Sequence, residues 1–190
     1  MDINPLVNIT ARAWALPVLG AMHDGVIGRQ SRLIAATGAS RTAFAQSLDH
    51  LIQSGLLERN PGHGHPLRAE FRLTQNGKPI AAMASQINTV SAFADHKLLR
   101  RAWTLPILAT LSEPRHFGVI KGQLGAITDR ALAQSLRSME DQAWISRQVN
   151  SAQRPPRPLY RAVNAGQEIS IIASRHKPVA TAHYPSHIDV

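Results

Sequence analysis

Residues 12–19 read RAWALPVL, and residues 101–108 read RAWTLPIL. The two octapeptides share six identical residues, and a second match follows in each half, where residues 45–48 and 133–136 both read AQSL. The offset between the halves is 89 residues at the first match and 88 at the second. An ordered series of matches at a nearly constant offset predicts that the chain contains two copies of one unit.

Helical periodicity predicts three helices at the start of each copy. In the first copy, a short helix is expected at residues 30–36, and Ser40 is suited to cap a third helix, as Thr128 is in the second copy. Pro17 and Pro106 are expected in a first helical turn, where the missing N–H is harmless. The inward residues of the third helix are Phe44, Leu48, Leu51 and Ile52 in one copy, and Leu132, Leu136 and Met139 in the other.

A β-hairpin is predicted after the third helix of each copy. Short apolar runs at residues 56–57 and 144–145 suit a first strand, and turn-rich loops at 60–66 and 153–158 follow. The order of helix, helix, helix, strand, loop, strand is that of a winged helix-turn-helix, so we expect a mainly α protein with small β-hairpins, of the α+β class. The returning strands are marked by alternating residues, Phe71 with Leu73 and Tyr160 with Ala162.

A helix is expected to join the two units. Pro79 can open it, and apolar residues then recur at alternating spacings of three and four, which suits packing against a partner helix. We therefore expect the first winged-helix unit plus the linking helix at residues 1–90, the second unit at 91–175 and a loosely ordered tail at 176–190. The seam consists of Ile80, Met83, Ile87, Val90 and Ala94.

The charge of the chain is strongly basic and unevenly divided. Its 190 residues include 21 Lys and Arg against 12 Asp and Glu, a net charge of +9. Residues 1–95 contribute +2 of this charge and residues 96–190 contribute +7. Such an excess favours a polyanionic partner, either nucleic acid or an anionic membrane surface.

Several classes of protein are disfavoured by what the sequence lacks. The chain has no cysteine, which excludes disulfides, zinc-thiolate sites and thiol redox sensing. No apolar run approaches the roughly 20 residues of a membrane span. The first ten residues, MDINPLVNIT, do not resemble a signal peptide, so we expect a cytoplasmic protein that does not associate with a membrane.

The ordered motifs of both copies resemble the HxlR-type transcriptional regulators, which are related to the MarR-like winged helices. The resemblance covers roughly residues 12–80 and 101–169. It implies a winged-helix fold, sequence-specific DNA binding and dimers that present two recognition helices. The second copy carries it in EPRHFG at 113–118, Ile127-Thr128, Met139-Glu140, Pro155-Pro156 and Tyr160-Arg161, and the first carries a weaker version in GLLER at 55–59, FRLT at 71–74 and Gly77.

The chain departs from that family in two respects. It holds two units in one polypeptide, which puts the usual homodimer in doubt, and it lacks the cysteine that some members use to sense oxidants or electrophiles. We expect an intrachain pseudo-dimer, with a homodimer formed through the Ile80–Val90 seam as the rival. A small-molecule effector is an open possibility.

Candidate DNA-binding residues lie at two places in each copy. A recognition helix inserts its N-terminal part into the major groove, where Arg can contact guanine and Gln adenine. Wing residues can hold phosphates. The alternative for each set is an ordinary solvated helix surface or hairpin tip. The candidates are Arg41, Thr42, Gln46 and His50 in the first recognition helix, Arg130, Gln134 and Arg137 in the second, Arg68 and Arg72 in the first wing, and Arg154 and Arg157 in the second.

Other chemistry is poorly supported. His63 and His65 lie two residues apart, but no third metal ligand accompanies them, so no metal site is expected. Trp14 and Trp103 are more typical of core anchors than of ligand-stacking groups. No nucleophile elbow, phosphate-binding loop or dinucleotide fingerprint is present, so neither an enzyme nor a cofactor is expected.

Two functions follow from these observations. The leading interpretation is a sequence-specific regulator that binds double-stranded DNA, with recognition helices in the major groove and wings on the backbone. The alternative is a winged-helix protein-interaction module that binds little or no DNA. The basic second half favours DNA, whereas the weakly charged first half leaves room for the alternative.

Overall fold

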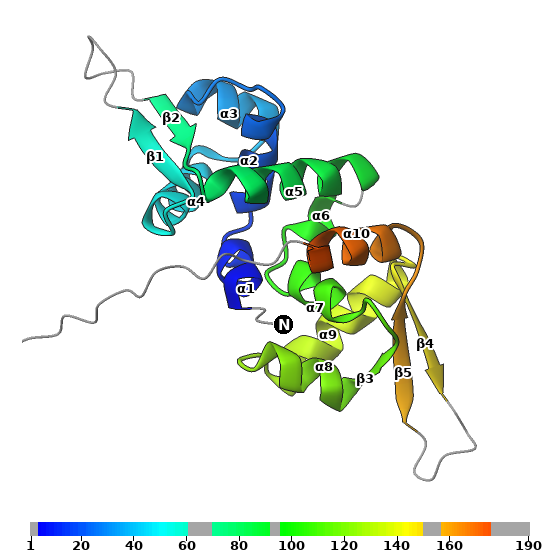
Figure 1. Ribbon diagram of the computed structural model, residues 1–190. Coiled ribbons are helices and arrows are strands. Elements are labelled where there is room, and N and C mark those ends of the chain that lie inside the picture. The colour runs from blue at the N-terminus through cyan, green and yellow to red at the C-terminus, as the bar shows by residue number, and fades with distance from the viewer. Residues whose placement is uncertain (1–3, 61–69, 92–95, 150–156, 176–190) are drawn as a thin grey trace, which may run out of the picture.

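The computed structural model describes residues 4–60, 70–91, 96–149 and 157–175, which form two units of similar architecture (Figure 1). The first unit, residues 4–91, contains α1 (Asn4–Thr10), α2 (Ala15–His23), α3 (Gln30–Thr37), α4 (Arg41–Gln53), β1 (Leu57–Asn60), β2 (Glu70–Leu73) and α5 (Gly77–Val90). The second unit, residues 96–175, contains α6 (His96–Leu99), α7 (Thr104–Thr110), β3 (Arg115–His116), α8 (Phe117–Leu124), α9 (Asp129–Asp141), β4 (Ile145–Val149), β5 (Pro158–Ala162) and α10 (Asn164–Arg175). The predicted mainly helical fold with small hairpins, repeated in tandem, is confirmed.

The predicted helix starts are confirmed at the level of single hydrogen bonds. The Ser40 hydroxyl accepts from the Ala43 N–H at 3.3 Å, and the Thr128 hydroxyl accepts from the Ala131 N–H at 3.2 Å. These bonds satisfy a backbone donor that has no partner within the first helical turn. Pro17 is the third residue of α2, so its missing N–H falls in the first turn as expected.

The hairpins follow the predicted alternation, with one element that the sequence did not reveal. In the first unit β1 pairs with β2, and in the second β5 lies between β3 and β4. Strand β3 was not predicted because it has only two residues. Its counterpart in the first unit is a single bridge between Arg29 and Glu70, reinforced by an ion pair between their side chains at 3.2 Å.

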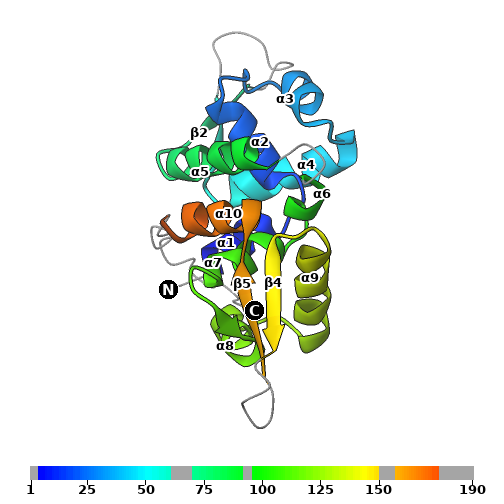
Figure 2. The same cartoon turned by 90° about the vertical axis from the view of Figure 1, so that its right-hand side faces the viewer.

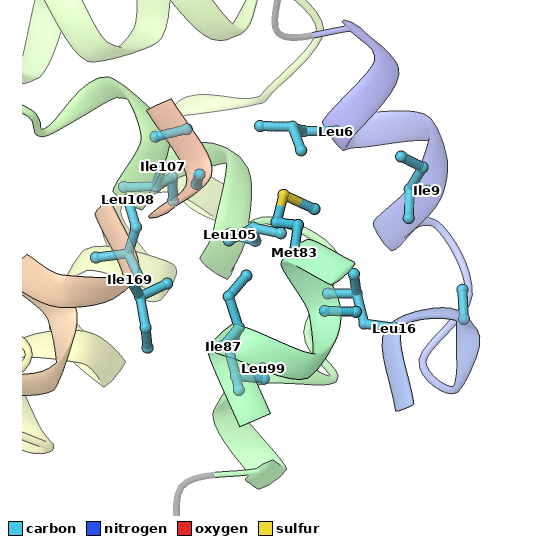
Figure 3. Close-up of a cluster of buried hydrophobic side chains, with 14 of the residues drawn as sticks. Leu6, Ile9, Leu16, Met83, Ile87, Leu99, Leu105, Ile107, Leu108 and Ile169 are labelled. Carbon is cyan, nitrogen blue, oxygen red and sulfur yellow. The ribbon is translucent and has the colours of Figure 1, made fainter. Parts of the chain in front are cut away.

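The two units share one hydrophobic core (Figure 3). Its central residues come from both halves of the chain: α5 contributes Met83 and Ile87, and α7 and α10 contribute Leu105 and Ile169, all of them buried. Helix α10 packs against both α7 and α5, so the last helices of the two units contact each other. Met83 and Ile87, at the middle of the predicted seam, are therefore covered by the same chain, whereas Val90 is half-buried.

The linking helix is shorter than the segment proposed from the sequence. Helix α5 ends at Val90, and Ser91 has an extended backbone with φ −85° and ψ 130°. Ala94, the last residue of the predicted seam, and the predicted tail at 176–190 lie outside the described residues.

Helix α1 reaches across to the second unit. It packs against α7, with Leu6 and Ile9 buried in the shared core. The Thr10 hydroxyl donates to the Ala102 carbonyl at 2.6 Å. Figure 1 shows α1 between the helices of the first unit and those of the second. The units are therefore connected by α1, by α5 with α10, and by the chain itself.

Candidate nucleic-acid interface

Each recognition helix presents an exposed stripe at matching positions. In α4 the stripe consists of Thr42, Ala45, Gln46 and Asp49, and in α9 it consists of Arg130, Ala133, Gln134 and Arg137. Spacings of three, four and seven residues place these side chains on one face of a helix. The opposite face is buried, with Leu48 in one helix and Leu136 in the other. We call these two sets the first and second reading stripes.

The two reading stripes differ in charge. The second carries Arg130 and Arg137, whereas the first has Thr42 and Asp49 at the same positions. Within the described part of the chain, neither Arg130 nor Arg137 forms an ion pair with an acidic residue. Their guanidinium groups are therefore available to a ligand, and Arg can donate two parallel hydrogen bonds to guanine.

One acidic residue of α9 has its charge partly offset by a neighbour. Lys121 of α8 contacts the Asp129 carboxylate, with 2.6 Å between Nζ and Oδ1. Asp129 is the first residue of α9, where a carboxylate also interacts favourably with the helix dipole. The matching residue in the first unit is Arg41, which is exposed. The N-terminus of α4 therefore carries a cation where α9 carries an acid paired with Lys121.

His50 forms a contact within the protein that the sequence does not predict. Its Nε2 lies 2.8 Å from the Asn8 carbonyl oxygen, which directs the half-buried ring toward α1. At the matching position in the second unit, Ser138 accepts a hydrogen bond from Arg101 Nη1 at 2.7 Å. In both units this position attaches the recognition helix to the segment that begins the unit. Contact of His50 with DNA stays a prediction.

The first wing carries charges of both signs. Arg72 is exposed on β2, directly opposite Glu58 of β1. With its side-chain amide oriented so that Oδ1 faces the guanidinium, Asn60 accepts two hydrogen bonds from Arg72, at 2.8 and 3.1 Å. Glu70 lies on the same strand. Arg68, the other candidate in this wing, lies outside the described residues.

The second wing is purely basic over its described strands. Arg157 is exposed immediately before β5, and Arg147 and Arg161 are exposed on β4 and β5. Neither strand contains an acidic residue. Arg154 lies outside the described residues. The described wings therefore show the same difference as the reading stripes, with the cations concentrated in the second unit.

Sequence reasoning missed four exposed residues that belong with these sets. Ala45 and Ala133 lie within the reading stripes, where a methyl group can contact thymine. Arg147 and Arg161 lie on the second wing. The spacing of three and four residues finds the alanines when it is applied to every residue type, and not only to polar ones. The arginines lie on the strands of the hairpin, outside the segment that proline and other turn residues mark.

The described part of the chain offers neither a metal site nor a membrane-spanning helix. No group of three or more His, Asp or Glu residues there is placed to hold a metal ion, and His63 and His65 fall outside it. None of its helices is both long and apolar enough to cross a membrane.

Comparison with known proteins gives one family. The model of the HxlR-like helix-turn-helix family matches twice, at residues 9–97 and 98–186. No protein matches among the curated ones. A solved structure from Porphyromonas gingivalis W83, described as a transcriptional regulator of the MarR family, is 19% identical, with a TM-score of 0.40 over 43% of this chain and 80% of that one. The two family matches together span most of the chain and divide it as its internal repeat does, and the chain therefore belongs to the HxlR-like helix-turn-helix family, of which it carries two units in tandem.

Proposed function

We propose that this protein is a transcriptional regulator that binds double-stranded DNA in a sequence-specific manner, with α4 and α9 in the major groove and the wings on the backbone. The observation that carries the proposal is the pair of reading stripes. Two recognition helices expose matched faces, and one of them carries Arg130 and Arg137, which form no ion pair with any described residue. Under this proposal the protein is cytoplasmic, associates with the nucleoid and catalyses no reaction.

We further propose that one chain supplies both recognition helices. A single winged helix reads few base pairs, and related regulators pair two by dimerisation about a two-fold axis. Burial of Met83 and Ile87 inside the shared core supports an intrachain pair, because that surface is then unavailable to a second chain. Under this proposal the chain divides into a first unit at residues 1–90 and a second unit at residues 91–175.

The two half-sites are expected to differ. Asp49 and Arg137 occupy matching positions with opposite charge, as do Arg41 and Asp129. The recognition helices therefore favour different bases, and the preferred site is asymmetric, with half-sites about one helical turn apart. Light scattering is expected to give a monomer, and footprinting an asymmetric site. A stable dimer on a perfect palindrome would overturn the intrachain pair but not the assignment of the fold.

Binding to random duplex DNA across a salt series separates the proposal from a protein-interaction module. A DNA-binding protein releases counterions, so its affinity falls steeply as salt rises. An interaction module shows little binding at any salt concentration. Weak binding at the lowest salt would therefore reject the proposal.

The second unit is predicted to dominate the affinity for DNA. The double substitution Arg130→Ala with Arg137→Ala should reduce affinity more than Arg41→Ala with Gln46→Ala. The reason is that a good side-chain pairing with a base is worth about 1–3 kcal/mol, and the second stripe carries two cations. Titration of each variant with the footprinted site measures the difference. Equal reductions, or a larger reduction in the first unit, would contradict this prediction.

A further inference from the structure

A cavity of about 650 Å3 lies at the junction of the two units. Trp14, which directly precedes α2, lines it together with Pro17 and Ala21 of α2. The segment that starts at α6 contributes Lys97 and Arg100. Figure 2 shows α6 between the helices of the first unit and those of the second. The volume falls within the range of about 300–1,000 Å3 that is typical of small-molecule sites.

The duplication shows how this cavity arises. Helix α6 is the counterpart of α1, and α2 is the counterpart of α7. Helix α1 packs against α7 through buried apolar side chains, whereas the counterpart pair, α6 and α2, encloses the cavity. Arg100 stands where the first copy has the small residue Ala11. The second copy therefore brings a long cationic side chain to a junction at which the first has a methyl group.

The chemistry of the walls selects a planar anion. The Arg100 guanidinium lies 4.5 Å from the centre of the Trp14 ring, which forms a flat cationic surface. Pro17 and Val26 add apolar wall, and Lys97 adds a second cation. Asp24 is the one acid among these lining residues. It accepts a hydrogen bond from the Ser85 hydroxyl at 2.5 Å, which directs the carboxylate toward α5.

The cavity also reaches the turn of the first helix-turn-helix. Residues 36–38, at the end of α3, form part of its lining. Gly38 ends α3 with φ +71°, and Ser40 caps the recognition helix α4 two residues later. The Thr37 hydroxyl donates to the Leu33 carbonyl at 2.7 Å and accepts from the Ala39 N–H at 3.4 Å. A ligand in the cavity would therefore contact the segment that orients α4.

We propose that this cavity is an effector site for a planar aromatic carboxylate of one or two rings. The apolar walls enclose the rings, and Arg100 with Lys97 holds the carboxylate. The further claim that occupancy changes DNA affinity rests on the proposed function, and linkage requires DNA to change the ligand's affinity by the same factor.

Isothermal titration calorimetry with 2-naphthoate tests the site without DNA. We expect one ligand per chain, and no heat from the neutral analogue 2-naphthylmethanol. Arg100→Gln and Lys97→Gln should each weaken binding by about tenfold, the effect of removing one charge-assisted hydrogen bond. Arg12→Gln removes an exposed arginine that does not line the cavity, so it controls for net charge and should change nothing. Trp14→Phe should weaken binding, and the matched variant Trp103→Phe should leave it unchanged, because Trp103 does not line the cavity.

Thermal unfolding of each variant identifies any that fails to fold. If Arg100→Gln fails to fold, Lys97→Gln tests the site instead, because Lys97 is exposed and its substitution leaves the core intact. Absence of binding at millimolar 2-naphthoate, or equal weakening in Arg12→Gln and Arg100→Gln, would overturn the site.

A second experiment measures DNA affinity with saturating 2-naphthoate. A severalfold change in the wild type that disappears in Arg100→Gln supports the coupling, and unchanged affinity overturns the coupling alone. A protein that binds 2-naphthoate but no DNA would instead reject the proposed function and leave the site intact.

Discussion

At the residue scale, two equivalent glycines allow the last helix of each unit to pack closely against its hairpin. Gly77 begins α5 and Gly166 lies near the start of α10, and a Cβ on either would overlap a backbone carbonyl oxygen, that of Leu56 or of Trp144 respectively. The backbone is not free to move aside, because the Leu56 carbonyl also accepts the Thr74 N–H at 3.1 Å. A side chain at these positions therefore displaces the last helix of the unit from its hairpin.

We predict that Gly77→Ala and Gly166→Ala each reduce the free energy of unfolding by about 1–3 kcal/mol, the cost of overpacking a tight contact. Gly122→Ala is the matched control. Gly122 lies inside α8, and a Cβ there meets no atom within 4 Å. That substitution should stabilise by about 0.5–1 kcal/mol, because alanine loses less entropy in a helix. Urea unfolding of the three variants measures the signs, and destabilisation by Gly122→Ala, or none by the other two, would contradict the prediction.

At the element scale, the recognition helices depend on their caps. Ser40→Ala and Thr128→Ala each remove the side-chain acceptor of the first turn, at a cost of about 1 kcal/mol. Hydrogen exchange should quicken first in the opening turn of α4 or α9 respectively. Replacement by Asp restores an acceptor, so Ser40→Asp should keep wild-type protection. Protection reduced equally in both helices of a single variant would contradict this local role.

Much of each unit could be predicted from the sequence because its signals are local. The caps at Ser40 and Thr128, the prolines in first turns and the alternation of Tyr160 with Ala162 all arise within a few residues. The exposed faces of the recognition helices followed from the same helical spacing.

The remaining features depend on contacts between distant segments. Helix α10 is not predicted from the sequence, although its apolar residues recur with helical spacing; its Ile169 and Ala173 are buried. His50 was expected to face DNA, but its partner is the carbonyl of Asn8, 42 residues earlier. The cavity beside Trp14 requires Arg100, which belongs to the other copy. Periodicity within one segment gives no information about such pairs.

At the scale of the whole molecule, the shared core predicts that the two units unfold together. Leu48 and Leu136 are buried at equivalent positions on the recognition helices, and both belong to that core. Either Leu→Ala substitution should cost about 2–5 kcal/mol and lower the temperature of a single transition for the entire chain. Calorimetry should give equal calorimetric and van't Hoff enthalpies. Two separated transitions, or a cost below about 0.5 kcal/mol at either residue, would contradict the prediction.

The opposite charges of Asp49 and Arg137 have a consequence for the direction in which the protein lies on DNA. A homodimer on a palindrome looks the same from both directions, so it cannot distinguish upstream from downstream. A chain with two unlike recognition helices fits an asymmetric site in one orientation only. The face that carries α10 would then always point toward the same end of the site, and inverting the site in a promoter would turn that face toward the opposite flank. The DNA sequence of each half-site can also change independently in evolution, because a substitution in α4 alters the preference of α4 and leaves that of α9 unchanged.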